Sequence, residues 1–152
     1  MNINVGDICM VDFTNDKNDR FTGIRPCLVM EIKNDMCTVL KLTTNQKIIQ
    51  SQGIIIRKEI KTGLIYDSAL VKHSSVIKLK LIISKVGSFD LNMYVGKSIK
   101  FYDKVGDIYN GIILKFIYHK RVFIVSYEGN SINKNTIVPI HAIIEVKSNI
   151  VH

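Results

Sequence analysis

Hydrophobic and polar residues alternate with a period of two along most of this chain, which is the pattern of half-buried β-strands. In the first half the pattern predicts strands over residues 8–13, 27–32, 36–42, 67–72 and 75–85, and a strand pair over 47–57 broken near 52–53. The short polar turn at 33–35 predicts that two of these strands form a hairpin. Residues 14–23 are polar and aperiodic, so we expect a loop there.

The pattern changes near residue 90, after which every break falls at a short polar turn. One helical turn over 91–95 is predicted to precede strands at 97–102, 109–118, 121–127, 136–138 and 142–146, with turns at 103–106, 119–120, 128–130 and 133–135. Short strands with tight turns are typical of a small barrel, and Gly111 allows the bend that a barrel needs. No convincing internal repeat is present.

The predicted fold is therefore mainly β (α+β) and is divided into two parts. Residues 1–90 are expected to form a small β-barrel core, and residues 91–152 a second, barrel-like β half. No stretch rich in Gly, Ser or Pro separates them, so we expect the second part to pack on the first.

Composition adds a charge to this picture. The chain has 152 residues, of which 47% are hydrophobic, and its 21 Lys and Arg exceed its 13 Asp and Glu to give a net charge of +8. Such a charge favours a polyanionic partner, most often nucleic acid, through counterion release. The charge is spread evenly, because residues 1–90 carry 13 basic and 9 acidic side chains and residues 91–152 carry 8 and 4.

The cysteines and the N-terminal sequence argue against a disulfide-rich, metal-binding, secreted or membrane-spanning protein. The three cysteines lie in predicted strands without a second Cys or His at ligand spacing, so we expect core residues and neither a disulfide framework nor a metal or cofactor site. The N-terminus lacks a signal-peptide pattern, and no apolar run approaches the roughly 18 residues that a membrane span needs. We expect a cytoplasmic protein with no membrane partner.

Two short motifs in the first half could bind phosphate. Arg25 lies between a Gly-ended loop and Pro26, whose ring restricts the local backbone, and such a guanidinium can clamp a phosphate at two points. Thr43 and Thr44 follow an apolar strand and offer hydroxyl donors. The alternative is that Arg25 makes a surface ion pair and the threonines start a turn.

The order of these motifs resembles the MazF/PemK family of toxin ribonucleases. Three segments carry the resemblance, Gly6–Phe13 (GDICMVDF), Arg25–Val29 (RPCLV) and Leu42–Thr44 (LTT), and 63–71 and 84–89 are similar to later family segments. The likeness covers about residues 3–90. It extends to the related toxins that a repeat RNA neutralises.

The resemblance implies the toxin of a bacterial toxin–antitoxin system, active in growth arrest and phage defence. It implies metal-independent cleavage of single-stranded RNA by attack of the 2′-hydroxyl, which leaves a 2′,3′-cyclic phosphate and a 5′-hydroxyl. Arg25 and Thr43 match the family's working pair, with Thr44 in support. The implied partners are RNA, a protein or RNA antitoxin, and a second copy of the chain in a homo-oligomer.

This chain departs from the family pattern in two places. His73 stands near the position of a family acid, so it is a candidate general acid or base, or else an exposed histidine at a strand end. Residues 91–152 replace a C-terminal helix; their aromatic residues either stack on RNA or fill a core.

We expect further RNA contacts from Lys17, Arg20, Lys47, Lys72 and Ser74. The alternative function is a non-catalytic module that binds nucleic acid or protein.

Overall fold

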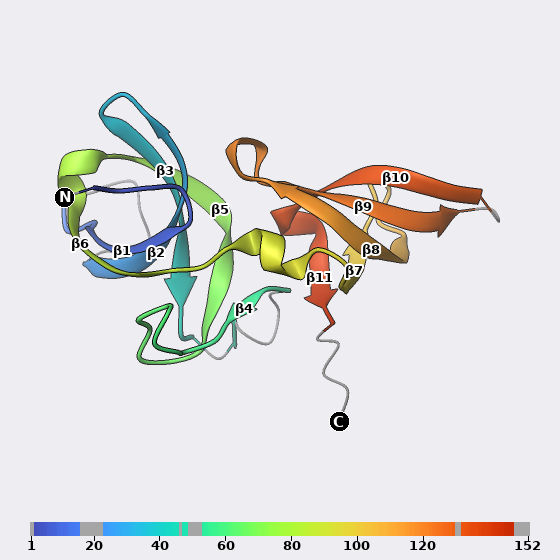
Figure 1. The fold of residues 1–152 in the computed structure, drawn as a ribbon, viewed down its shortest axis with the longest axis horizontal. Helices are drawn as coiled ribbons and strands as arrows, with labels where there is room; N and C mark the ends of the chain where they lie inside the picture. Colours follow the sequence, from blue (N-terminus) through green and yellow to red (C-terminus); the bar gives the residue numbers. More distant parts are fainter. Residues whose placement is uncertain (1, 16–22, 46, 49–52, 130–131, 148–152) are drawn as a thin grey trace. The chain divides into compact units, whose positions relative to one another are not determined.

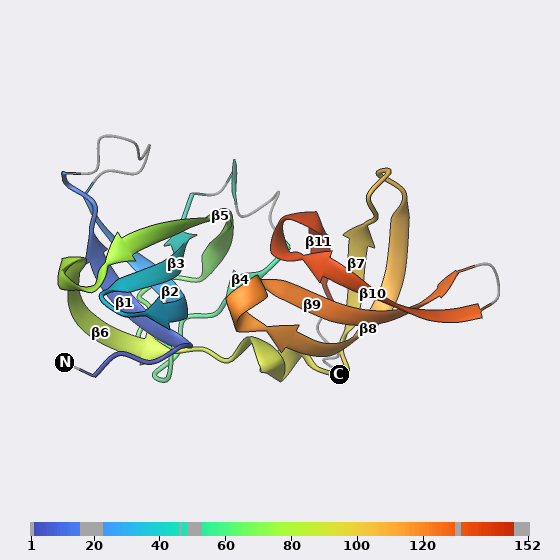
Figure 2. The ribbon, with the colours of Figure 1, turned by 90° about the horizontal axis from the view of Figure 1, so that it is seen from above.

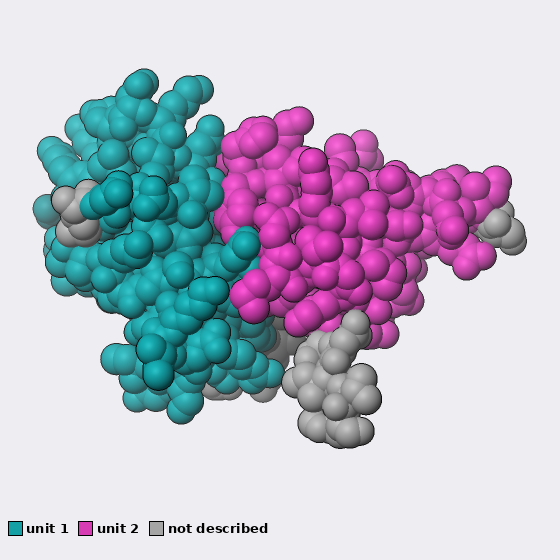
Figure 3. All heavy atoms as spheres, in the orientation of Figure 1, with its two compact units in different colours: residues 1–50, 55–90 teal, residues 51–54, 91–152 magenta. Residues whose placement is uncertain are grey.

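The computed structural model describes residues 2–15, 23–45, 47–48, 53–129 and 132–147, which form an all-β structure (Figure 1). The chain divides into two compact units, which are coloured separately in Figure 3. Unit 1 contains residues 1–50 and 55–90, and unit 2 contains residues 51–54 and 91–152. The prediction that the fold is mainly β, with two sheets in succession, is confirmed.

Unit 1 is a six-stranded antiparallel sheet that curls into a half-barrel (Figure 1). Its strands are β1 (Asp7–Asp12), β2 (Ile24–Lys33), β3 (Met36–Thr43), β4 (Ile55–Ile56), β5 (Ser68–Lys78) and β6 (Ile82–Ser88), and the 3-10 helix η1 (Leu79–Leu81) precedes the last. The order across the sheet is β4-β5-β3-β2-β1-β6, so the first strand pairs with both the second and the last.

Unit 2 is a five-stranded antiparallel sheet in the order β10-β9-β8-β7-β11. Its strands are β7 (Ser98–Tyr102), β8 (Ile108–Ile117), β9 (Val122–Gly129), β10 (Ile132–Pro139) and β11 (Ile143–Val146). Three 3-10 helices, η2 (Leu91–Tyr94), η3 (Tyr118–Lys120) and η4 (Ile140–Ala142), lie before β7, between β8 and β9, and before β11. Figure 2 shows β9 and β10 as a long hairpin.

Two predicted breaks are wrong for the same physical reason. The expected gap at residues 73–74 lies inside β5, where Ser74 and Ser75 pair with Leu40 and Val39 of β3. The expected turn at 133–135 lies inside β10, which pairs with β9 over its whole length. In both places hydrogen bonds to a neighbouring strand outweigh the weak strand preference of Ser and Asn.

The strand pair predicted over 47–57 reduces to β4 in the part of the chain that the structure describes. Residues 49–52, including half of the expected break, lie outside the described residues.

The three cysteines are confirmed as core residues. Cys9, Cys27 and Cys37 are at most 1% exposed and pack with Val11 and Val29 in the core of unit 1. Burial raises the pKa of Cys9 and Cys37 to about 11 and that of Cys27 further, so all three are neutral thiols at physiological pH.

Most of the aromatic residues in the second half pack against one another. The rings of Phe101, Tyr109 and Tyr127 form one cluster, with centroid separations of 5.1 to 6.1 Å. Phe116 contacts two further rings, those of residues 118 and 123. These contacts favour the core interpretation over a stacking surface, and Tyr102, at 46% exposure, is an exception among the aromatic residues of 91–152.

The fold repeats although the sequence does not. Each unit has a first strand paired with the second and the last, and a 3-10 helix immediately before the last strand. Before each first strand, a glycine of positive φ (Gly6, 91°; Gly96, 87°) donates its N–H to a carbonyl of the second strand, Val29 or Ile113, at 2.8 Å. A bulge follows both acceptors, so the two units share backbone detail as well as topology.

Candidate active site

Arg25 and Thr43 lie in one row across the sheet of unit 1. Arg25 pairs with Val11 of β1, and Thr43 pairs with Ala69 of β5. The β2–β3 register, continued two residues past its last paired residues, sets Arg25 opposite Thr43. Directly opposite residues share a face of the sheet, so this register sets Arg25 and Thr43 on one face, each next to an apolar residue of the adjoining strand. We call these two residues the Arg25–Thr43 pair.

The hydroxyl of Thr43 has a structural partner that still leaves it a donor. Asn45 donates its N–H to Thr43 Oγ1 at 3.1 Å, and Lys47 donates its N–H to Asn45 Oδ1 at 3.0 Å. The interpretation that Thr43 starts a turn is therefore correct. Because Oγ1 accepts in this bond, its own O–H can donate to a ligand. Thr44 and Lys47 are exposed beside this turn.

The Arg25–Thr43 pair lies where two long connections begin or end. Residues 13–23 join β1 to β2, and Phe13 N–H donates to the Gly23 carbonyl at 2.8 Å, which closes the base of the predicted loop. Residues 44–67 join β3 to β5 and include β4. Lys17 and Arg20, the RNA contacts expected in the first connection, lie outside the described residues.

A buried lysine beside the pair was missed in the sequence. Lys41 is 6% exposed, and its ammonium lies 4.5 Å from the centroid of the Phe13 ring. It precedes Thr43 by two residues and so lies on the same face of β3. A charged side chain inside the apolar run Val39–Leu42 was the available signal. Burying a charge is costly unless it is compensated, and the Phe13 ring is one compensating partner of this ammonium.

His73 lies beside Lys41, away from the Arg25–Thr43 pair. In β5 the register skips between Ser74 and Leu70, so residues 71–73 together face Lys41. His73 is exposed in the middle of a strand, which corrects the interpretation as a strand-end residue. Since neighbouring strands are about 4.8 Å apart, the β5 backbone is about 10 Å from that of Arg25. Lys72 and Ser74 flank His73, half-buried and exposed respectively.

The end of the second long connection is fixed by a carboxylate. Asp67 accepts from the N–H of Lys58 at 2.7 Å and from the Arg57 guanidinium at 3.1 Å. The backbone hydrogen bond from Lys58, followed by the smaller contribution of Arg57, lowers the pKa of Asp67 below 3.8. Asp67 is therefore ionised at neutral pH and stabilises the loop.

Unit 2 has different side chains at the matching places. Val29 in β2 and Ile113 in β8 are the residues that the bulges follow. Arg25 lies four residues before Val29, and Tyr109 lies four residues before Ile113. By the same count, Tyr127 matches Lys41 and Gly129 matches Thr43. Unit 2 therefore has aromatic rings where unit 1 has cations.

Within the described residues, no group of three or more His, Cys, Asp or Glu side chains could hold a metal ion. Among the same residues, no helix is both long enough and apolar enough to cross a membrane.

Neither the comparison with protein-family models nor that with curated proteins gives a match for this chain.

Proposed function

We propose that unit 1 is a metal-independent endoribonuclease for single-stranded RNA, and that the chain is the toxin of a bacterial toxin–antitoxin system. The observation that carries the proposal is the Arg25–Thr43 pair, a guanidinium opposite a hydroxyl on one face of the sheet. Residues 13–23 and 44–67 border it, and loops on a rigid scaffold commonly bind substrates.

The chemistry needs few protein groups because RNA supplies its own nucleophile. The 2′-hydroxyl oxygen attacks the adjacent phosphorus, the bond to the 5′-oxygen breaks, and one proton leaves the nucleophile while another reaches the leaving oxygen. Arg25 stabilises the charge that develops on the phosphoryl oxygens, and Thr43 donates to a non-bridging oxygen. The products are a 2′,3′-cyclic phosphate and a 5′-hydroxyl.

Lys41 and His73 have supporting parts in the proposal. Lys41 contributes positive charge from beneath the Arg25–Thr43 pair, where low exposure strengthens its electrostatic effect. His73 is a candidate proton carrier that would act through a bound water or the substrate, because its strand lies about 10 Å from that of Arg25.

The test is cleavage of an unstructured RNA in excess EDTA, followed by analysis of the ends. We expect cleavage, with cyclic phosphate and 5′-hydroxyl ends. Arg57→Ala is a matched control, because Arg57 is an exposed arginine of unit 1 that pairs with Asp67. A strict requirement for Mg²⁺ together with 5′-phosphate ends would overturn the proposal.

A cellular test addresses the toxin assignment. Expression in bacteria should arrest growth, and Arg25→Ala should relieve the arrest at equal protein levels. Mapping the 5′ ends of cellular RNA shortly after induction should reveal the preferred cleavage sequence. Growth arrest that persists with Arg25→Ala would instead favour a binding module without catalysis.

A further inference from the structure

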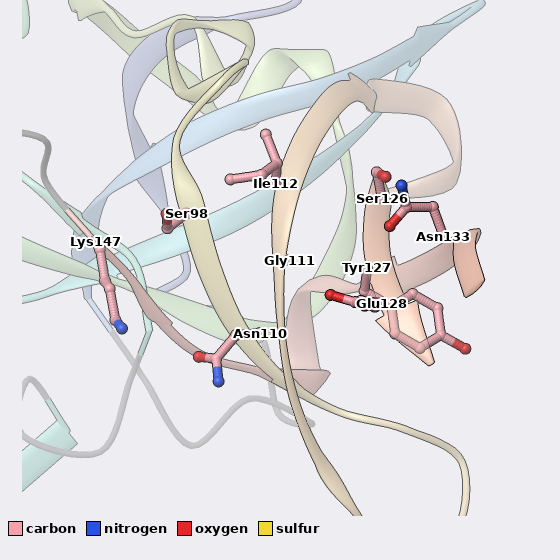
Figure 4. Close-up of a pocket in the computed structure, with 9 residues that line it drawn as sticks. All are labelled: Ser98, Asn110, Gly111, Ile112, Ser126, Tyr127, Glu128, Asn133 and Lys147. Atoms are coloured by element: carbon pink, nitrogen blue, oxygen red, sulfur yellow. The ribbon is translucent and has the colours of Figure 1, made fainter. Parts of the chain in front are cut away.

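A hollow of about 440 Å³ lies on unit 2, in the size range of small-ligand sites. Most of its lining residues have polar side chains, although the larger part of the lining surface is apolar: Ser98, Asn110, Gly111, Ile112, Ser126, Tyr127, Glu128, Asn133 and Lys147. Figure 4 shows β8 running through the middle, with Ser98 and Lys147 on one side and Ser126 to Glu128 and Asn133 on the other. The proposed catalysis uses none of these residues.

The polar side chains form an ordered row across the sheet. Glu128 of β9 pairs with Asn133 of β10, and Lys100 of β7 pairs with Asn110 of β8. The β8–β9 register, continued by one residue, sets Asn110 opposite Glu128. From Lys100 to Asn133 the row therefore reads cation, amide, carboxylate, amide on one face, over about 14 Å at the usual strand spacing. Beyond Lys100 the row continues to Glu145 of β11, which pairs with this lysine.

The next row of the sheet, Ser98, Ile112 and Ser126, gives the hollow an apolar residue between two short side chains. Ile112 is 43% exposed and pairs with Ser98 on one side and Ser126 on the other. Both serines are short, so the isoleucine side chain is open to a flat ligand placed over it. Lys147 donates its N–H to the Ser98 carbonyl at 2.9 Å, which brings a second lysine to the same side as Lys100.

We propose that this hollow, the Asn110–Asn133 site, binds a nucleotide of single-stranded RNA. The base lies over Ile112, the amides of Asn110 and Asn133 bond to its edge, and the phosphates lie towards Lys100 and Lys147. Unit 2 carries four more basic than acidic residues outside positions 51–54, and this net positive charge favours a polyanionic ligand over a neutral one. The inference rests on the proposed function for the identity of the ligand as RNA.

Glu128 makes the site selective among bases. A carboxylate accepts hydrogen bonds, so it pairs with an exocyclic amino group such as that of cytosine. Uracil presents a carbonyl oxygen at that position, which a carboxylate repels. The Asn110–Asn133 site should therefore prefer cytosine over uracil.

The experiment measures binding of the full chain to fluorescent 2′-O-methyl oligonucleotides, which lack the attacking hydroxyl and cannot be cleaved. Wild type should bind oligocytidine more tightly than oligouridine. Replacing both Asn110 and Asn133 by Ala should weaken oligocytidine binding about tenfold or more. Glu128→Gln should reduce the preference for cytosine, because an amide can also donate to uracil. Circular dichroism confirms that each variant is folded.

Lys134→Gln is the matched control, since it changes an exposed residue of the same strand, beside Asn133, on the opposite face of β10. It should change the Kd by no more than about twofold. An equal loss with Lys134→Gln, or no loss with the double Asn variant, overturns the Asn110–Asn133 site. Binding that depends on the two Asn residues in a chain that does not cleave RNA supports the site and rejects the proposed catalysis.

Discussion

Units 1 and 2 have one strand topology but very different connections. In unit 1, residues 13–23 join β1 to β2, and residues 44–67 join β3 to β5; the second connection includes β4 and residues 51–54, which belong to unit 2. The matching connections of unit 2 are residues 103–107 and 130–131. Long loops are tolerated on a stable strand scaffold and commonly carry function. The long connections beside Arg25 and Thr43 are therefore a feature that the proposed catalytic site of unit 1 uses and that unit 2 lacks.

The same places in the two sheets also differ in chemistry. Unit 1 has Arg25 and the buried Lys41, whereas unit 2 has Tyr109 and Tyr127 with ring centroids 5.1 Å apart. Unit 1 thus has cations where unit 2 has an aromatic pair, and the ammonium of Lys41 lies over the Phe13 ring.

The chain carries separate reporters for the two units. All three cysteines belong to unit 1, and five of the six tyrosines belong to unit 2, so thiol reactivity and tyrosine fluorescence can follow the units separately.

The largest expected effect is that of ending the chain at Asp90. The Gly53 carbonyl accepts a hydrogen bond from Val146 at 3.3 Å, and Ile54, in the same segment of unit 2, is 3% exposed. Truncation removes Val146 and the rest of unit 2 after residue 90, so the segment 51–54 loses its partners. Fragment 1–90 should therefore be insoluble, or its cysteine thiols should react at pH 7. A soluble fragment with protected thiols would show that unit 1 needs nothing from unit 2.

The next prediction compares Arg25 with its counterpart Tyr109. Arg25→Ala should slow RNA cleavage by about 10²- to 10³-fold, because the guanidinium stabilises transition-state charge. Arg25→Lys should restore little, since an ammonium lacks the planar fork. Tyr109→Ala should lower the thermal stability of unit 2 and leave cleavage within a fewfold range. Equal cleavage by wild type and Arg25→Ala would contradict the site.

A core substitution tests Ile113, whose carbonyl accepts the hydrogen bond from Gly96 and which the bulge of β8 follows. Ile113 is fully buried, so Ile113→Ala should lower the free energy of unfolding of unit 2 by about 2–5 kcal/mol. Urea titration followed by tyrosine fluorescence measures the loss. Ile137→Ala is the control, because Ile137 is 63% exposed and its truncation should cost no more than about 0.5 kcal/mol. Similar losses would mean that the core of unit 2 is not where the structure has it.

Gly96, the glycine that precedes the first strand of unit 2, offers a test with a smaller expected effect. A Cβ at Gly96 meets no atom within 4 Å, so the cost of Gly96→Ala comes from its positive φ alone. We expect a loss of about 1–2 kcal/mol in the free energy of unfolding. Gly96→Asn should cost less, because Asn tolerates the left-handed region. A loss from Asn equal to that from Ala would argue against this conformation.

The smallest effect concerns acid stability of the long connection in unit 1. The pKa of Asp67 is lowered in the folded protein, so its contribution is present above its ordinary value of 3.8 and is lost as the pH falls through the folded value. Asp67→Asn should therefore slightly lower the melting temperature at pH 7 and leave it unchanged near pH 2. A larger difference at low pH would reverse the sign and contradict the assignment.

Local pattern was sufficient for some parts of the fold and failed for others. Alternation predicted the hairpin of β2 and β3, and the Asp and Gly residues predicted the turn at 103–106, because side-chain period and turn chemistry are properties of a few adjacent residues. It failed at Ser74 in β5 and at Asn133 in β10, where the decisive hydrogen bonds come from β3 and β9. The resemblance supplied Arg25 and Thr43 as candidates but not the row that joins them.

The sequence by itself predicted a mainly β chain with a net positive charge, buried cysteines and three candidate phosphate-binding residues, Arg25, Thr43 and Thr44. The tertiary structure alone decided that Arg25 and Thr43 lie on one face of the sheet, that Lys41 is buried on that face, and that the two units share one strand order apart from β4. The reason is that strand register and burial depend on residues distant in the chain. The same strand scaffold can form from different apolar residues, so its repetition leaves little trace in the sequence.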